Sequence, residues 1–273
     1  MVFAAAASWG TWSLFVRPTG LPSTVTSPLV FAIMAVVALP LGVRDPRPTW
    51  DRRAYALVAA NSVLDALNLV TFFGAMAQSS VAIAVLTHYC APIFIAVAAP
   101  RVDGVVTRGV RPAAAVALAG LVVVMEPWRA LDRSAIVGGA LGVASALCYA
   151  GNVFVVRRLS AQIGPARAVG WHSVGAALLL APFAAPQLGA ITAPAVGRIA
   201  IGAVTIGAVS GIVFNAGLGR IGSARAAVLT FAEPIVAVAV GVLAWHEPLQ
   251  PLAAVGGALV LGAGVYVARS TRT

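Results

Sequence analysis

The sequence predicts an all-α integral membrane protein with ten transmembrane helices, arranged as two inverted five-helix repeats with both termini in the cytoplasm. Composition, ten apolar windows and a resemblance between the two halves lead to this prediction. Of the 273 residues, 60% are hydrophobic and only 10% are charged, and the mean hydropathy is +0.96. A soluble domain carries about 25% charged residues. With so little polar surface to face water, the chain belongs in a lipid bilayer.

Apolar windows that are long enough to cross a membrane recur along the whole chain. About 20 apolar residues span the hydrocarbon core as a helix. The windows with few charges fall at 2–16, 24–43, 54–76, 80–100, 110–126, 135–156, 166–187, 196–219, 224–245 and 249–268. The first window starts at Met1 and is short, so we expect either a bare first helix or a trimmed one. Because no charged start is followed by a cleavage site, we expect no signal peptide.

The arginines predict the orientation of these helices. All 18 basic residues are arginine. If the N-terminus is cytoplasmic, the inside loops hold fourteen of them, and the outside loops hold Arg17, Arg129, Arg133 and Arg198. The positive-inside rule favours this orientation in the cytoplasmic membrane. The net charge of +10 therefore orients the protein in the membrane, and we expect no nucleic-acid partner.

The two halves of the chain, residues 1–130 and 131–273, resemble each other in sequence. SVAIAVLT at 80–87 aligns with SARAAVLT at 223–230, and ASWGTWSLFVR at 7–17 aligns with LCYAGNVFVVR at 147–157. Because each half holds five predicted helices, an odd number, the second half is expected to be inverted relative to the first. Secondary transporters are commonly built in this way, with the substrate site near the midplane between the repeats. Chance similarity of Ala/Val-rich helices is the alternative, but it does not explain the shared order of serine, Val-Leu-Thr and proline.

The second half also resembles a known family. The segment SARAAVLTFAEPIVAVAVGVLAWHEPLQPLAAVGGALVLGAGVYVA is similar to the last two helices of the drug/metabolite transporter superfamily, and within it of the ten-helix EamA-type transporters. The resemblance extends over the chain as a pattern. One departure is the end of the fourth helix, where many members have Gly-Glu and this chain has APRVDG, so that Asp103 is a candidate substitute. The resemblance implies a transporter of amino acids, other metabolites or drug-like compounds.

Three titratable residues are expected near the middle of the membrane. Glu233 lies about 13 Å from the inner end of its helix and His88 about 12 Å from the outer end of its own, at 1.5 Å per residue. Asp65 lies midway along the third window. A charged group at the bilayer centre costs roughly 2.5–3.5 kcal/mol and marks a functional site by default. We interpret Glu233 and Asp65 as proton or substrate-amine sites, with His88 as a partner; a purely structural, neutral Glu233 is the alternative.

Two prolines are predicted to interrupt helices at nearly matching places of the repeat. Pro92 and Pro234 lack the backbone donor that a continuous helix needs, and each is expected to kink its helix. Paired interruptions in corresponding helices point to a binding site. We therefore predict hinge positions at these two residues, the alternative being passive kinks that aid packing.

Further polar and aromatic side chains are candidates for lining the same site, although aromatic residues also anchor at interfaces and asparagine also bonds between helices. These are Tyr89, Trp9, Trp12, Tyr149, Asn152, His172, Asn61 and Asn68. Trp9 and Tyr149 are equivalent in the repeat alignment, so one aromatic from each half could flank a ligand. Asn215 lies nearer the inner end and suits a gate or a helix contact better.

Other classes of function find little support in the sequence. Cys90 and Cys148 are interpreted as small packing residues; no second histidine follows His246 at the spacing of a zinc motif; and no P-loop is present, so no ATP-driven pump is expected. No metal, cofactor or catalytic residue is predicted. The favoured function is secondary transport of a small metabolite by alternating access, as a monomer or homodimer. Broad efflux of drugs or lipophilic cations is the alternative, and an intramembrane enzyme or a channel belongs to another class.

Overall fold

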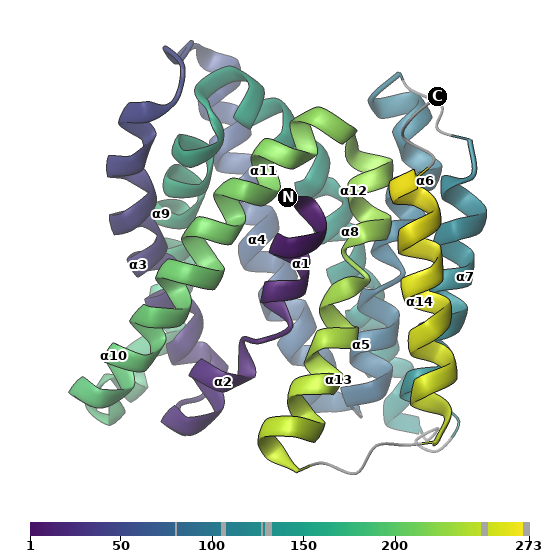
Figure 1. Cartoon of the computed structure of the whole chain (residues 1–273). Coiled ribbons are helices and arrows are strands. Elements are labelled where there is room, and N and C mark those ends of the chain that lie inside the picture. The colour runs from purple at the N-terminus through teal and green to yellow at the C-terminus, as the bar shows by residue number, and fades with distance from the viewer. Residues whose placement is uncertain (80, 105–107, 127, 129–132, 247–250, 270–273) are drawn as a thin grey trace.

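The computed structural model describes the chain except residues 80, 105–107, 127, 129–132, 247–250 and 270–273 (Figure 1). All regular structure in the described part is helical. Within the described residues, seven helices are long and apolar enough to cross a membrane, judged by length and composition, and two shorter apolar helices accompany them. The fold is therefore that of a multi-pass membrane protein.

The elements bounded among the described residues of the N-terminal part are seven α-helices and two 3₁₀ turns. They are α1 (Val2–Trp9), α2 (Ser13–Val16), η1 (Arg17–Thr19), α3 (Ser23–Leu41), η2 (Gly42–Arg44), α4 (Arg52–Gln78), α5 (Val81–His88), α6 (Ala91–Val102) and α7 (Val110–Met125).

The C-terminal part forms seven more α-helices, a 3₁₀ turn and a π-helical segment. They are α8 (Arg133–Ile163), α9 (Pro165–Ala184), η4 (Ala185–Ala190), α10 (Ala193–Gly202), the π-helix η5 (Ala203–Val209), α11 (Ser210–Ile221), α12 (Ser223–Leu229), α13 (Ala232–Trp245) and α14 (Pro251–Arg269).

Every window expected from the sequence contains a helix, but two windows hold helices shorter than a full span. The first holds only the eight-residue α1 and the four-residue α2. The fifth holds the 16-residue α7, Val110–Met125. The count of ten transmembrane helices therefore stays a prediction.

Helix ends follow from local side-chain chemistry. Asp51 precedes α4, and its carboxylate accepts a 2.7 Å hydrogen bond from the backbone N–H of Ala54. That bond is the largest cause that lowers the pKa of Asp51, as expected for an acidic cap at a helix N-terminus. At the start of α9, the Asp45 carboxylate accepts a 2.8 Å hydrogen bond from the backbone N–H of Arg167. Both carboxylates hold a helix start at the membrane surface.

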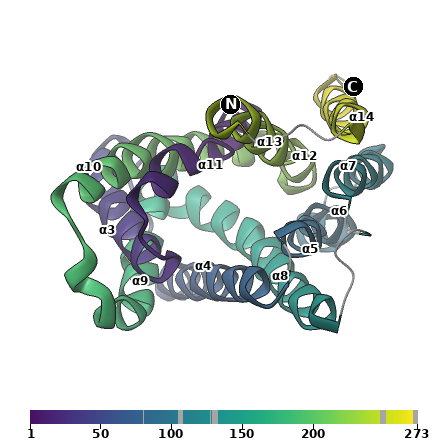
Figure 2. The ribbon, with the colours of Figure 1, turned by 90° about the horizontal axis from the view of Figure 1, so that it is seen from below.

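The helices pack in pairs around the long axis of the molecule (Figure 2). The most extensive pairings are α4 with α8, α3 with α9 and α7 with α14. Seen from below, α4 and α8 lie on one side of the bundle, and α11, α12 and α13 lie on the other (Figure 2). Helices from the two parts of the chain are therefore interleaved and do not form two separate bundles.

The end of α6, where the sequence departs from the family pattern, is tied to α8. Asp103 forms a 2.8 Å ion pair with Arg157, and its side chain is only 5% exposed. The neighbouring Arg158 donates a 2.6 Å hydrogen bond to the carbonyl of Val102. Cations near a helix C-terminus are favourable because the last carbonyls carry partial negative charge. Asp103 thus has a structural partner at this turn.

Candidate functional site

Two broken helices bring backbone turns into the membrane region. One break lies at Tyr89 and Cys90, between α5 and α6, and the other at Thr230 and Phe231, between α12 and α13. Pro92 is the second residue of α6. A backbone N–H at this position has no intrahelical acceptor, so the helix loses no hydrogen bond to the proline. The first break therefore lies two to three residues before Pro92, and the second lies three to four residues before Pro234.

Pro234 is the third residue of α13, directly after Glu233. In the break before it, the backbone N–H of Glu233 donates a 3.0 Å hydrogen bond to the carbonyl of Thr230. The Thr230 carbonyl would otherwise pair with position 234, where proline has no N–H. The proline thus explains why Glu233 lies at a helix start and not inside a continuous helix.

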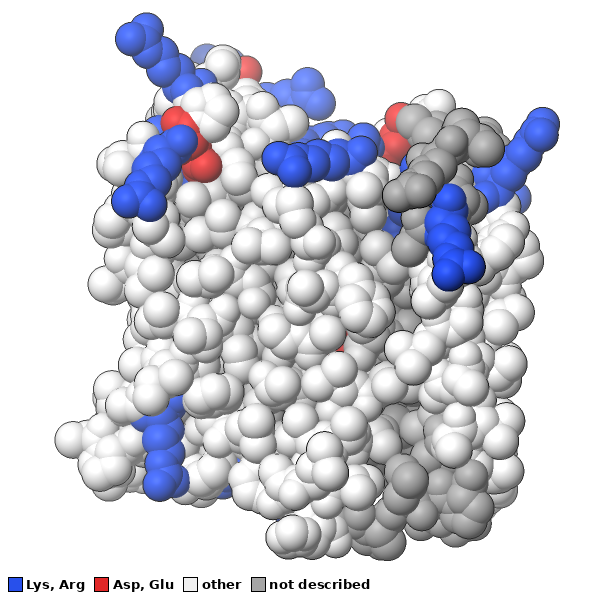
Figure 3. All heavy atoms as spheres, viewed as in Figure 1, with Lys and Arg blue, Asp and Glu red and all other residues white. Residues whose placement is uncertain are grey.

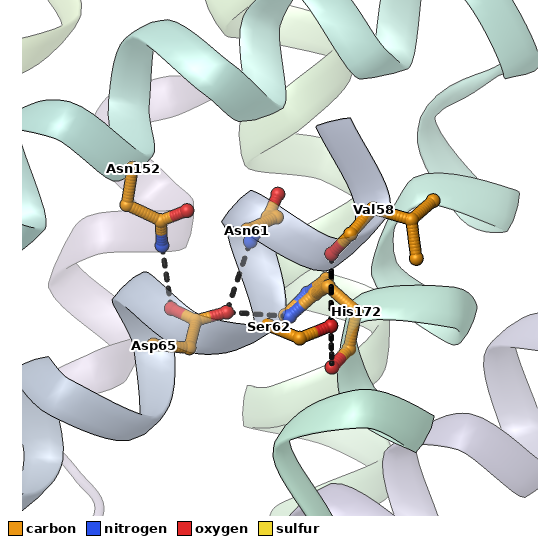
Figure 4. Close-up of polar contacts among 6 residues, drawn as sticks. All are labelled: Val58, Asn61, Ser62, Asp65, Asn152 and His172. Atoms are coloured by element: carbon orange, nitrogen blue, oxygen red, sulfur yellow. Dashed lines mark hydrogen bonds and ion pairs between the residues drawn. The ribbon is translucent and has the colours of Figure 1, made fainter. Parts of the chain in front are cut away.

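Asp65 on α4 is bonded to side chains of three helices (Figure 4). Its Oδ1 accepts a 2.5 Å hydrogen bond from the Asn152 amide on α8, and its Oδ2 accepts a 3.0 Å bond from the Asn61 amide one turn earlier on α4. The Nδ1 atom of His172 on α9 lies 2.5 Å from the same Oδ2. The side chains of Asp65 and His172 are 13% and 11% exposed. This shielded carboxylate therefore joins α4, α8 and α9.

The Asp65 group is further held by its surroundings. The Ser62 hydroxyl lies 3.2 Å from the carbonyl of His172 and 2.9 Å from that of Val58 (Figure 4). The ring of Phe31, on α3, meets the His172 ring edge-on at a centroid distance of 6.1 Å. The Oδ1 atoms of Asn61 and Asn152 are buried and have no hydrogen-bond partner in the described structure. Both amides are thus oriented by the carboxylate, to which they donate.

Glu233 is bonded across the two broken helices. The hydroxyl of Tyr89, at the break between α5 and α6, forms a side-chain hydrogen bond with the Glu233 carboxylate. The Tyr89 ring also packs against Phe231, with the ring centroids 5.9 Å apart. The two breaks therefore contact each other through an acidic and an aromatic residue.

Tyr149 on α8 lies between the two acidic residues. It is close enough to both Glu233 and Asp65 for each carboxylate to act on its hydroxyl electrostatically. The same hydroxyl forms a side-chain hydrogen bond with Thr230, at the break before α13. The Thr230 hydroxyl also donates to the carbonyl of Ala227 at 2.7 Å.

His88, the last residue of α5, is surrounded by aromatic rings. Its ring centroid lies 4.9 Å from that of Phe72, 5.3 Å from Tyr89 and 5.5 Å from Tyr149. Its Nδ1 atom lies 2.8 Å from the hydroxyl oxygen of Ser145 on α8. His88 therefore belongs to the same neighbourhood as Glu233, although its hydrogen bond is to a different residue.

Helix α1 contacts this neighbourhood from the other side. The indole N–H of Trp9 donates a 3.2 Å hydrogen bond to the carbonyl of Ile206 in the π-helix η5, and its ring lies 4.8 Å from that of Phe214. Trp12 packs close to Gly202, immediately before η5. A π-helix within a longer helix is uncommon and is frequently found at functional sites. The sequence did not indicate this segment or its contact with the tryptophans.

The predicted site residues thus fall into two adjoining groups. The Asp65 group contains Asp65, Asn61, Asn152 and His172. The Glu233 group contains Glu233, Tyr89, Tyr149, Thr230, His88, Ser145 and Asn68. Asp65, His88 and Glu233 were expected at one depth, and in the structure each bonds to different partners, with Tyr149 as the common neighbour.

Sequence reasoning missed Ser145 and Thr230 as members of the Glu233 group. Ser145 stands four residues before Tyr149, which is one helical turn, and that spacing was a readable signal. Thr230 had been noted only as the end of the repeated Val-Leu-Thr. Asn215, expected at a gate or helix contact, is buried in α11.

No set of three or more His, Cys, Asp or Glu residues in the described part could hold a metal ion. A cavity of about 520 Å³ lies elsewhere, lined by residues that include Val2, Gly217, Arg220, Leu229 and Gly264.

Comparisons with known proteins find similarity to transporters in sequence and to a solved structure in fold. The model of the EamA-like transporter family matches residues 136–269. A protein of Archaeoglobus fulgidus, named as an uncharacterized transporter, is 29% identical over 274 residues, which cover 98% of this chain and 94% of that protein. A solved crystal structure is similar with a TM-score of 0.82 at 20% identity, covering 98% of this chain and 96% of that one. At this identity the crystal structure supports the fold alone.

Proposed function

We propose, from the match of residues 136–269 to the model of the EamA-like transporter family, that this chain moves a small metabolite across the cytoplasmic membrane by alternating access. Family and relative point to a transporter and not to an enzyme. The observation that carries the proposal is that Asp65, a largely buried carboxylate on α4, and Glu233, at the start of the interrupted helix α13, share Tyr149 as a neighbour. Polar groups and broken helices at membrane depth are tolerated where they line a substrate path.

The pairing of helices supports two inverted repeats, residues 1–130 and 131–273. In two such repeats, each of the first five windows corresponds to the window five places later. Three packed pairs join corresponding windows directly: α3 with α9, α7 with α14 and α6 with α12. The helix that corresponds to α4 is α11, and the one that corresponds to α8 is α1; the pair α4 with α8 and the corresponding pair α11 with α1 both make contact. A two-fold relation between the halves accounts for this pattern, because it requires contacts to occur in such matched sets.

The arginines support cytoplasmic termini. In the space-filling view, blue side chains gather at one end of the molecule and are sparse at the other (Figure 3). The chain's C-terminus lies at the arginine-rich end (Figures 1 and 3). The positive-inside rule assigns that end to the cytoplasm.

The proposed cargo is an amino acid or a similar small amphipathic metabolite, and the proposed direction is export. Asp65 and Glu233 are the candidate proton or substrate-amine sites, and Tyr89, Tyr149 and His88 are their candidate partners. Pro92 and Pro234 are the proposed hinges, because each follows directly on a break through which the two repeats contact each other. Coupling to protons or exchange of substrates supplies the energy, and the protein works as a monomer or homodimer.

Efflux of lipophilic cations is the second candidate, and one observation favours it. Glu233 lies among the rings of Tyr89, Tyr149 and Phe231. Aromatic faces attract organic cations, and a neighbouring carboxylate adds to that attraction.

Uptake into proteoliposomes tests the proposal. Purified protein would be given a labelled panel of amino acids, purines and lipophilic cations, with and without an imposed pH gradient. We expect gradient-driven accumulation of one class of compound, reduced at least tenfold in Glu233→Gln, because the amide cannot carry a proton or a negative charge. Accumulation of the cations alone would select efflux of lipophilic cations instead.

Asp51→Asn is the matched control, because it removes a carboxylate at the membrane surface and keeps a good helix cap. We expect it to transport like the unaltered protein. Gradient-independent exchange that survives in Glu233→Gln would reduce Glu233 to a structural residue, and no uptake of any panel member would contradict the proposed cargo classes.

A further inference from the structure

Ser145 lies at the centre of a short chain of hydrogen bonds between three helices. It belongs to α8 and is fully buried. Its hydroxyl oxygen lies 2.7 Å from Oδ1 of Asn68 on α4, 3.2 Å from the backbone carbonyl of Asn68, and 2.8 Å from Nδ1 of His88 on α5. The serine therefore has three polar neighbours and one proton to share among them.

The two contacts with Asn68 decide where that proton goes. A backbone carbonyl only accepts, and the side-chain oxygen of Asn68 also accepts, so Ser145 donates toward Asn68. With its proton committed there, the Ser145 oxygen is an acceptor toward His88. Nδ1 of His88 must then carry a hydrogen, because otherwise two acceptors would face each other at 2.8 Å.

A neutral imidazole carries one hydrogen, so this arrangement leaves Nε2 of His88 with a free lone pair. The His88 ring is held in place by Phe72, Tyr89 and Tyr149. Nε2 makes no hydrogen bond to the described residues. It is also not completely buried, so part of its surface is accessible. The hydroxyls of Tyr89 and Tyr149 are already engaged, by Glu233 and Thr230.

We infer that Ser145 is a positioning residue that fixes His88 in its Nδ1–H form and so presents Nε2 as a hydrogen-bond acceptor near Tyr89 and Tyr149, the two tyrosines that His88 shares with Glu233. The inference rests on the proposed function and deepens it. A substrate that contacts both Glu233 and His88 meets two acceptors, and it has to present N–H or O–H groups to both. Ammonium, amide and hydroxyl groups meet this requirement, and a quaternary ammonium group does not.

Nitrogen-15 NMR of the histidine rings tests the assignment directly. The chain has only three histidines, so protein labelled in the imidazole nitrogens gives a simple spectrum, and His88→Gln identifies the signals of His88. The protein would be held in lipid nanodiscs at about pH 8.5, where an ordinary imidazole is neutral. Protonated and unprotonated ring nitrogens have well-separated shifts, so each tautomer can be recognised.

In the unaltered protein we expect His88 to carry its hydrogen on Nδ1. In Ser145→Ala, where the acceptor is lost, we expect a change toward the Nε2–H form. Ser62→Ala is the matched control, because Ser62 is an equally buried serine on α4 that bonds only to the backbone carbonyls of Val58 and His172. It should leave the His88 signals unchanged, and the unaltered His246 signals report that each variant is folded.

An Nε2–H or doubly protonated His88 in the unaltered protein would overturn the inference, and so would an Nδ1–H form that persists in Ser145→Ala. The spectrum requires no transport. If His88 has the expected tautomer but no compound is taken up, only the proposed function is contradicted. If the protein transports but His88 has the opposite tautomer, only this assignment is contradicted.

Discussion

At the residue scale, Asp65 determines how the side-chain amides around it are oriented. Its two oxygens accept hydrogen bonds from Asn152 and Asn61, and His172 lies against one of them. An asparagine amide can turn either way, and these two are turned by the carboxylate. A ligand or proton that binds Asp65 therefore competes with side chains of three helices, and so couples binding to helix contacts.

We predict that Asp65→Ala destabilises the protein, because it leaves the amides of Asn61 and Asn152 without their acceptor and removes the carboxylate that contacts the His172 ring. The expected loss is about 1–3 kcal/mol, the desolvation cost of unsatisfied buried groups. The free energy of unfolding would be measured in detergent by circular dichroism for Asp65→Ala, Asn152→Ala and the double variant. Since the two residues share a bond, the double variant should lose less than the two single losses combined; strict additivity would contradict this interaction.

Part of the Asp65 group could be predicted from the sequence. Asn61 and Asp65 are four residues apart, so one helix face holds both. Asp65, Asn152 and His172 were each recognised as polar residues in apolar windows. Their mutual contact could not be predicted, because helical periodicity gives the depth and face of a side chain but not which helix lies opposite. Ser145 was missed for the same reason, since a serine in an apolar helix is informative only when its partners are known.

At the scale of elements, the three interruptions at residues 10–12, 89–90 and 230–231 surround the Glu233 group. The last two were expected from Pro92 and Pro234. The first has no proline, and its cause is tertiary: α1 lies between the π-helix η5 and α13, and it approaches α13 through Gly10. A close approach of two backbones depends on the neighbour as much as on the glycine, so composition alone does not reveal it.

Gly10 provides a test of this approach. A Cβ atom added there would overlap the backbone carbonyl oxygen of Glu233 and would lie 2.8 Å from the backbone nitrogen of Ala237. Backbone atoms cannot rotate away, so Gly10→Ala must displace α1 from α13. We expect a loss of about 1–3 kcal/mol, which is typical of overpacking, together with reduced transport, because the displaced backbone carries Glu233.

Gly219→Ala is the matched control for Gly10→Ala. Gly219 lies in helix α11 and nothing lies within 4 Å of an added Cβ, whereas Gly10 has a helical backbone conformation at the end of α1. Thermal unfolding and uptake would be measured for both variants. Since alanine is the better helix former, Gly219→Ala should be neutral or slightly stabilising. Equal behaviour of the two variants would contradict a close contact between α1 and α13.

At the scale of the whole molecule, the uneven distribution of arginines gives the protein a direction in the membrane. The arginine-rich end carries the loop between α3 and α4, whereas the loop after α9 belongs to the opposite end (Figures 1 and 3). An inverted repeat alone does not determine orientation, because its two halves have opposite directions. The distribution of arginines among the loops therefore determines the orientation of the protein in the membrane.

Cysteine labelling in intact cells tests this orientation. In a background with Cys90→Ala and Cys148→Ala, single cysteines would be introduced by Thr49→Cys, in the loop before α4, and by Gln187→Cys, in η4 after α9. Both positions are exposed in the structure. We expect a membrane-impermeant maleimide to label Gln187→Cys in intact cells and Thr49→Cys only after lysis. Labelling of both after lysis is the internal control for reactivity. The reversed pattern would place the termini outside, and it would mean that the arginine-rich end faces away from the cytoplasm.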